Sequence, residues 1–122
     1  MVPQKFSWRG RLKSFVYAYE GLTWFFRREH NAWIHAFITL AVLLASLIFK
    51  ISKLEFIAVL IAIALVLVAE MCNTAIEKIM DHLSPAQNPA VKAIKDIAAA
   101  AVLLAAIIAA IIGLLIFIPK IV

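Results

Sequence analysis

The sequence predicts an all-α integral membrane protein with three transmembrane helices and one amphipathic surface helix near the N-terminus. Apolar residues make up 66% of the 122 residues, against roughly 45–50% in ordinary soluble domains. Most of them gather in three long runs, and the mean hydropathy of the chain is +1.02. A chain of this length is expected to form one domain, here residues 1–122.

Residues 6–28 are predicted to form the amphipathic helix. Large apolar side chains recur there every three or four residues, with basic residues between them. This pattern is typical of a helix that lies on a membrane with its basic face toward anionic head groups. Packing against the protein's own bundle explains it equally well. The apolar positions are Trp8, Leu12, Phe15, Tyr19, Leu22 and Phe26.

Three apolar segments follow, and each is long enough to be considered a membrane span. They cover residues 33–49, 54–76 and 97–118. The last contains no charged residue, and Pro119 is expected to end its helix because proline has no backbone N–H to donate. Pro85 and Pro89 predict a loop between the second and third spans, with a helix restarting from Val91.

The basic residues predict the orientation, because cytoplasmic loops carry an excess of lysine and arginine. Three spans place six basic residues before the first span on the same side as Lys78, Lys92 and Lys95. The other side has Lys50, Lys53 and Lys120. With nine basic residues on one side and three on the other, the N-terminus and the second loop are predicted to lie in the cytoplasm.

Glu70 interrupts the second span. Residues 56–69 separate it from Glu55 and would extend about 21 Å as a helix, in a hydrocarbon layer roughly 30 Å thick. Glu70 is therefore expected near the cytoplasmic edge of the bilayer. Helical spacing places it on one stripe with four further polar residues. The stripe is Glu70, Asn73, Thr74, Glu77 and Asp81.

An ionisable residue inside a span is by default a functional candidate. The alternative is a polar cluster that joins helices, and for Asn73 and Thr74 both interpretations stay open. Other charged residues are expected at the same depth. Polar residues that could meet the stripe are Glu29 before the first span, then His30, Asn31 and His35, with Lys95 and Asp96 before the third span.

This arrangement suggests phosphate chemistry at a membrane surface. Carboxylates beside a lysine suit a magnesium-bound nucleotide, because Mg²⁺ prefers oxygen ligands. A separate carboxylate at lipid depth, Glu70, suits a general base for a lipid alcohol. With three glycines in all, the chain has no glycine-rich phosphate loop, and its single cysteine, Cys72, excludes an intramolecular disulfide.

Two other function classes compete with a kinase. A small proton-coupled transporter could use Glu70, but such proteins place their carboxylate near the midplane, between repeated sets of spans. A structural subunit would not need acidic residues entering from all three helices.

The stretch "AEMCNTAIEKIMDHL", followed by "AIKDIAAAAVLLAA", resembles the signature of the prokaryotic diacylglycerol kinase family, which includes undecaprenol kinases. The shared pattern is E-x-x-N-[ST]-A-I-E-x-x-x-D, then a K-D pair and a run of small residues. Ile94 stands where the pattern has alanine. The N-terminal "LKSFVYAYEGLTWFFRREHNAWIH" and the ending "IIGLLIFIPKI" also fit, so the resemblance covers nearly the whole chain.

The resemblance implies a homotrimer of three-span subunits in the bacterial inner membrane. It implies transfer of the γ-phosphate of ATP, with Mg²⁺, to undecaprenol or diacylglycerol, for recycling of a lipid carrier or of phospholipid. Nucleic acid is not an expected partner. "NAWIH", with His35, and "FIPKI" look more like the undecaprenol branch.

The resemblance also assigns roles by position. Glu70 corresponds to the catalytic base, and Glu77 and Glu29 correspond to residues that hold the metal and the nucleotide. The other expected nucleotide contacts are Tyr17, Asn73, Gln87, Asn88, Lys95 and Asp96. Many relatives have histidine where this chain has Asn88, which leaves its role open. An arginine also contacts the nucleotide in relatives, and here either Arg9 or Arg11 could match it.

Overall fold

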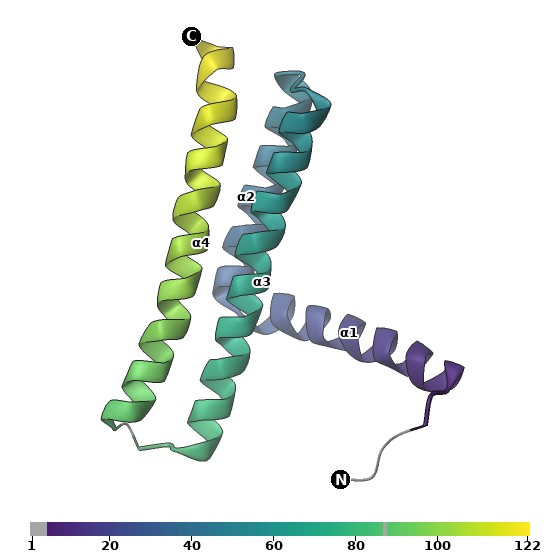
Figure 1. Ribbon diagram of the computed structural model, residues 1–122, viewed down its shortest axis with the longest axis vertical. Coiled ribbons are helices and arrows are strands. Elements are labelled where there is room, and N and C mark those ends of the chain that lie inside the picture. Colours follow the sequence, from purple (N-terminus) through teal and green to yellow (C-terminus); the bar gives the residue numbers. More distant parts are fainter. Residues whose placement is uncertain (1–4, 87) are drawn as a thin grey trace. The chain divides into compact units, whose positions relative to one another are not determined.

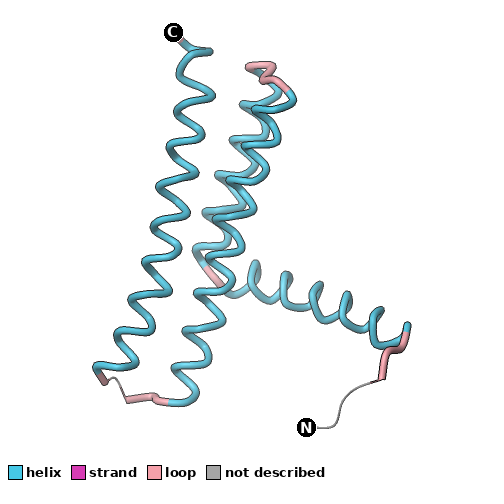
Figure 2. The backbone as a smooth tube through the Cα atoms, in the orientation of Figure 1, coloured by secondary structure: helices cyan, strands magenta, loops and turns pink. Residues whose placement is uncertain are grey.

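The computed structural model describes residues 5–86 and 88–122, and within these ranges the chain is all-helical, as predicted (Figure 2). The helices are α1 (Trp8–Arg28), α2 (His30–Ile48), α3 (Lys53–Leu83) and α4 (Pro89–Ile121). The chain divides into two compact units, Met1–Ile34 and His35–Val122. Each unit is described by itself.

In the first unit, α1 is a helix that lies within the predicted range 6–28 and begins at Trp8. Ser7 caps its N-terminus, since its hydroxyl accepts a hydrogen bond of 3.0 Å from the Gly10 backbone N–H. Arg27 and Arg28 lie in the last turn, where positive charge complements the helix dipole. Apolar side chains such as Trp8 and Phe15 are exposed along the helix.

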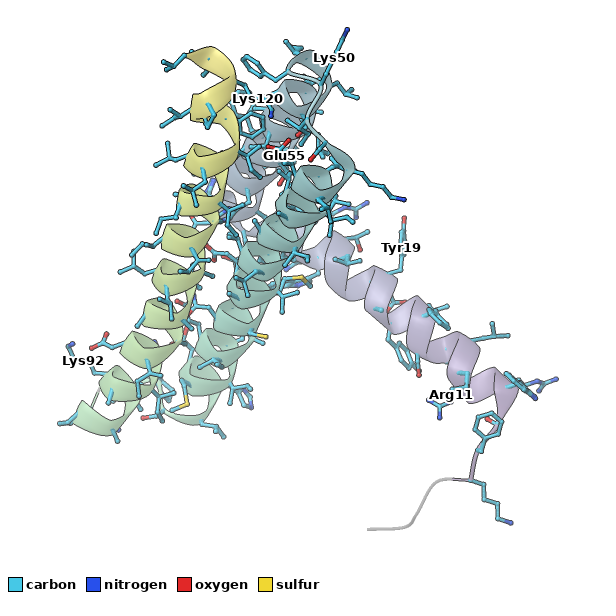
Figure 3. All side chains as sticks on the ribbon, turned by 45° about the horizontal axis from the view of Figure 1, so that its top comes forward. Arg11, Tyr19, Lys50, Glu55, Lys92 and Lys120 are labelled. Carbon is cyan, nitrogen blue, oxygen red and sulfur yellow. The ribbon has the colours of Figure 1, made fainter. Side chains whose placement is uncertain are left out.

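In the second unit, α2 and α3 meet at a short connection. Ser52 and Glu55 form a capping box in which each side chain accepts from the other's backbone N–H, at 3.1 and 2.9 Å. Lys50 takes a positive φ of 50° in the turn. Lys120 on α4 reaches Glu55 with a nitrogen–oxygen distance of 3.1 Å. Figure 3 shows Lys50, Glu55 and Lys120 at one end of this unit and Lys92 at the other.

The third predicted span lies within α4, but the ends predicted for that helix, Val91 and Pro119, were wrong. Asn88 caps the helix and Pro89 opens it, so it begins before Val91. Pro119 does not end it, because the helix continues to Ile121 and the Val122 N–H still bonds to the Ile118 carbonyl at 3.1 Å. So close to the C-terminus, the hydrogen bond that proline removes lies in the last turn, where few bonds depend on it.

Helices α3 and α4 lie side by side over much of their length (Figure 1). Small side chains are buried along both of them, including Ala62, Ala98 and Ala105. Small residues let helix backbones approach closely, which is how apolar helices pack in a membrane. In the described parts of the chain, α2 has no comparably close backbone contact with either helix.

Three helices, α2, α3 and α4, are long and apolar enough to cross a membrane. The 31 residues of α3 extend about 46 Å, well beyond a hydrocarbon layer of roughly 30 Å. The polar end of α3 can therefore project from the lipid while the helix stays continuous. The polar stripe predicted over residues 70–81 lies on this one helix.

Candidate active site

Glu70 on α3 is buried and pairs with the partly buried His35 on α2. Nε2 of His35 lies 2.8 Å from Oε1 of Glu70, and the two side chains are 19% and 9% exposed. A buried carboxylate is costly unless it is hydrogen-bonded. When Nε2 carries a proton it donates to the carboxylate, which holds Glu70 in one orientation.

The sequence places His35 among the polar residues that could meet the stripe, and the structure confirms that it does. What the sequence does not give is that His35, rather than its polar neighbours His30 and Asn31, is the partner of Glu70. His35 lies in the half of α2 away from the Lys50 turn, and Glu70 occupies the corresponding half of α3. Proximity between them depends on how the helices are rotated, which spacing along one helix does not give.

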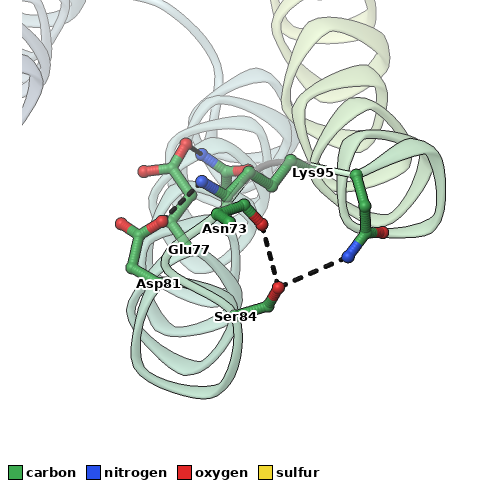
Figure 4. Close-up of polar contacts among 7 residues, drawn as sticks. Asn73, Glu77, Asp81, Ser84 and Lys95 are labelled. Carbon is green, nitrogen blue, oxygen red and sulfur yellow. Dashed lines mark hydrogen bonds and ion pairs between the residues drawn. The ribbon is translucent and has the colours of Figure 1, made fainter.

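Asn73 and Glu77 follow on the same stripe of α3. The Asn73 amide nitrogen donates to Oε1 of Glu77 at 3.2 Å (Figure 4). Within the described residues, the amide oxygen of Asn73 is buried without a hydrogen-bond partner. A buried polar atom without a partner is rare in proteins, and a water molecule or an ion is a usual partner for such an atom. Thr74, also on this stripe, is buried.

These oxygens fit a magnesium ion that is shared with phosphate. Mg²⁺ is usually held by one or two carboxylates together with substrate phosphate oxygens and water. In residues 5–86 and 88–122, no three His, Cys, Asp or Glu side chains are placed to hold a metal by themselves. The Glu77 carboxylate and the unpartnered Asn73 oxygen would be the few protein ligands that such an ion needs.

Two ion pairs lie near the loop that joins α3 to α4. Nζ of Lys95 on α4 bonds to Oδ1 of Asp81 on α3 at 2.5 Å, so the two helices are joined at this end (Figure 4). Asp96 instead pairs with Lys92 on its own helix at 2.6 Å, and both side chains are more than half exposed. The structure thus joins Lys95 to the polar stripe through Asp81, whereas the Asp96 carboxylate is engaged on α4.

Gln87 and Asn88 were predicted to lie over the nucleotide, and the structure describes only Asn88. Gln87 lies outside the described residues. Asn88 caps α4, since its Oδ1 accepts from the Val91 N–H at 2.9 Å, and its amide nitrogen donates to the Ser84 hydroxyl at 3.3 Å. Both polar atoms of the Asn88 side chain are therefore engaged in ordering the loop.

Tyr17 and Glu29 belong to the first unit. Tyr17 is exposed on α1. Glu29 ends α1, with its backbone N–H bonded to the Phe25 carbonyl at 3.1 Å, and its own carbonyl accepts from the Ala32 N–H at 3.2 Å. The residue thus forms the corner at which one helix ends and the next begins.

A search against protein families adds an independent finding. The model described as prokaryotic diacylglycerol kinase matches residues 16–117, which include the stripe on α3 and the Lys95–Asp96 pair. The chain belongs to the prokaryotic diacylglycerol kinase family. The resemblance inferred from the sequence is confirmed, and so is the prediction that the protein is an enzyme, a lipid kinase of the membrane.

Two similar proteins have different kinase names. An undecaprenol kinase of Bacillus subtilis is 41% identical over 108 residues, which cover 88% of each chain. A diacylglycerol kinase of Synechocystis sp. is 35% identical over 109 residues, covering 88% of this chain and 62% of the relative. Membership in this kinase family favours the kinase over the transporter and over a structural subunit.

Proposed function

We propose that this protein transfers the γ-phosphate of ATP to the hydroxyl of a membrane lipid alcohol and yields the lipid monophosphate. The observation that carries the proposal is the Glu70–His35 pair, with Asn73 and Glu77 further along the same stripe and Lys95 of α4 paired to Asp81 at its end. One helix thus offers a carboxylate at lipid depth and polar groups at its projecting end. Family membership supports this arrangement as a kinase site.

Glu70 is the proposed general base. A hydroxyl that reaches it from the bilayer gives its proton to the carboxylate. The hydroxyl oxygen bonds to the γ-phosphorus while the bond from that phosphorus to the β–γ bridging oxygen breaks, so ADP leaves. His35 is a positioning residue, because its hydrogen bond fixes the carboxylate without touching the substrate.

The nucleotide is proposed to lie at the projecting end of α3. Glu77 and Asn73 would hold Mg²⁺ there, and the resemblance adds Glu29. A bound Mg²⁺ supplies positive charge against the phosphates, and phosphoryl transfer depends mainly on such electrostatics and on positioning. Lys95 adds a positive charge. The remaining contacts proposed from the resemblance alone are Tyr17, Gln87, Asn88 and Asp96.

Undecaprenol is the favoured acceptor, with diacylglycerol as the alternative. The undecaprenol kinase is more similar to this chain than the diacylglycerol kinase is. The matched region also covers a larger share of the undecaprenol kinase than of the diacylglycerol kinase. A product of this kind would serve lipid-carrier recycling. Further proposals are an inner-membrane location, a cytoplasmic N-terminus and second loop, a homotrimer, and a surface position for α1.

The test is phosphate transfer by the purified protein in mixed micelles with radiolabelled ATP and Mg²⁺. Undecaprenol and a diacylglycerol are supplied separately, and a lipid without a hydroxyl serves as the control. We expect incorporation that depends on lipid and metal and is faster with undecaprenol. No incorporation into either alcohol would overturn the proposed function, and faster transfer to diacylglycerol would reverse the acceptor assignment.

A further inference from the structure

A groove lies between α2, α3 and α4 in the second unit, with a volume of about 340 Å³. Its walls are apolar except for His35 and Thr39 on α2. Pockets of this size are typical of small-molecule sites. The helices that line it are the three apolar candidate spans, so the groove lies at lipid depth.

The groove leads to Glu70. On α3 it is lined by Val59, Ile63 and Val66, which continue the stripe of Glu70 at helical spacing. Val66 is four residues before Glu70, or about 6 Å along the helix. His35 lines the groove and also bonds to the Glu70 carboxylate. One end of the groove is therefore formed by His35, which bonds to the proposed base.

Small residues on α4 create the space. Ala106, Ala109, Ala110 and Gly113 line the groove on that helix. A Cβ placed on Gly113 would meet no atom within 4 Å, so the space in front of it is open. The far end is closed by Phe117, whose ring packs edge-on against Phe49 with centroids 6.0 Å apart.

The length and lining of the groove suit a hydrocarbon chain. From Ala106 to Phe117 the groove follows α4 for about 16 Å. Apolar side chains from all three helices line it, and such a lining favours an apolar ligand.

We infer that this groove binds the chain of an isoprenoid alcohol, with the hydroxyl directed to Glu70 and the chain extending toward Phe117. The inference rests on the proposed function and adds to it a specificity site for the acceptor. The small residues of α4 then decide which lipid is accepted. Gly113 matters most, because a larger side chain there would enter the space that the chain needs.

A photo-crosslinking experiment tests binding without relying on activity. The wild-type protein in micelles is irradiated with an isoprenoid alcohol that carries a diazirine in its chain, and the labelled peptides are mapped by mass spectrometry. We expect labels at groove positions on α4, in the range 106–117, that are displaced by undecaprenol and less effectively by a diacylglycerol. Labels spread evenly over lipid-facing residues such as Leu103 and Leu115 would overturn the inference.

A kinetic experiment with matched variants gives a second test. Gly113→Leu fills the groove, and Ala109→Leu fills it from a neighbouring position if the first variant folds poorly. Ala101→Leu is the control, since Ala101 is exposed on α4 and does not line the groove. We expect about a tenfold rise in KM for undecaprenol in the two groove variants, a smaller rise for a short isoprenoid alcohol, and an unchanged KM for ATP.

The outcomes separate the possible failures. If the wild-type protein phosphorylates no lipid, the proposed function fails whatever the crosslinks show. If wild-type activity is present but the groove variants match Ala101→Leu, the groove inference alone is wrong. If Gly113→Leu instead changes the oligomeric state in size-exclusion chromatography without a change in lipid KM, a second copy of this chain occupies the groove and the inference is overturned.

Discussion

Nε2 of His35 on α2 lies 2.8 Å from the Glu70 carboxylate on α3, and both side chains are largely buried. This contact joins two helices whose backbones do not approach as closely as those of α3 and α4. It fixes a carboxylate next to His35, which lines one end of an apolar groove. The proposed chemistry depends on that orientation, and five experiments follow from the structure.

Glu70→Gln should abolish turnover. Glutamine keeps the size of the side chain and an oxygen that can accept from His35, but it cannot take the proton of a hydroxyl. General-base removal is expected to lower kcat by about 10²- to 10⁴-fold. ATP binding, measured by equilibrium dialysis, should stay near the wild-type value. Activity close to that of the wild type would exclude Glu70 as the base.

His35→Ala should lower kcat on the order of 10²-fold, because a misplaced catalytic group loses about that much. His35→Gln offers an N–H that can donate to Glu70 and should recover a large part of the rate. KM for ATP should not change in either variant. A purely structural role would predict equal rates per folded molecule in both variants, so lack of rescue by glutamine would contradict the positioning role.

Asn73→Ala should raise the Mg²⁺ concentration needed for half-maximal activity. Loss of a group that supports a metal ligand typically costs about 10- to 100-fold in metal affinity. The control is Cys72→Ala, since Cys72 is the exposed neighbour on α3. A magnesium titration of initial rates checks the prediction, and identical curves for the two variants would remove Asn73 from the metal site.

Asp81→Ala and Lys95→Ala break the same ion pair, but only the second removes the lysine. Comparing them separates the contribution of the ion pair to stability from the role of Lys95 in nucleotide binding. Asp81 is 61% exposed and Lys95 is 32% exposed in their side chains. Such pairs contribute less than about 1 kcal/mol to stability. Both variants should unfold near the wild-type temperature in detergent. Only Lys95→Ala should raise KM for ATP, and equal KM values in the two variants would argue against a nucleotide contact.

Asn88→Ala should destabilise the protein by about 1 kcal/mol, the usual cost of losing an N-cap. Asn88→Asp keeps an oxygen that can accept from the Val91 N–H and should restore most of the loss. Thermal unfolding followed by circular dichroism measures the difference. If the alanine variant instead keeps its unfolding temperature and loses affinity for ATP, the residue acts on the nucleotide rather than as a cap.

The helices and the polar stripe could be predicted from local pattern. Long apolar runs specify helices in a membrane, because every backbone polar group must be satisfied within its own segment. The 3.6-residue repeat then places Glu70, Asn73 and Glu77 on one face of α3 without reference to any other helix. The ends of the helices could not be predicted as well. Pro119 shows why, because a proline in the final turn removes only one backbone hydrogen bond and the helix continues past it.

The contacts between helices could not be predicted in this way. The pairing of His35 with Glu70, the choice of Asp81 rather than Asp96 as the partner of Lys95, and the groove in front of Gly113 all depend on the rotation and separation of packed helices. Periodicity gives the face of one helix but not the face that it meets. The sequence by itself therefore determined the spans, the family and the polar stripe, whereas only the tertiary structure decided which groups touch and where space remains.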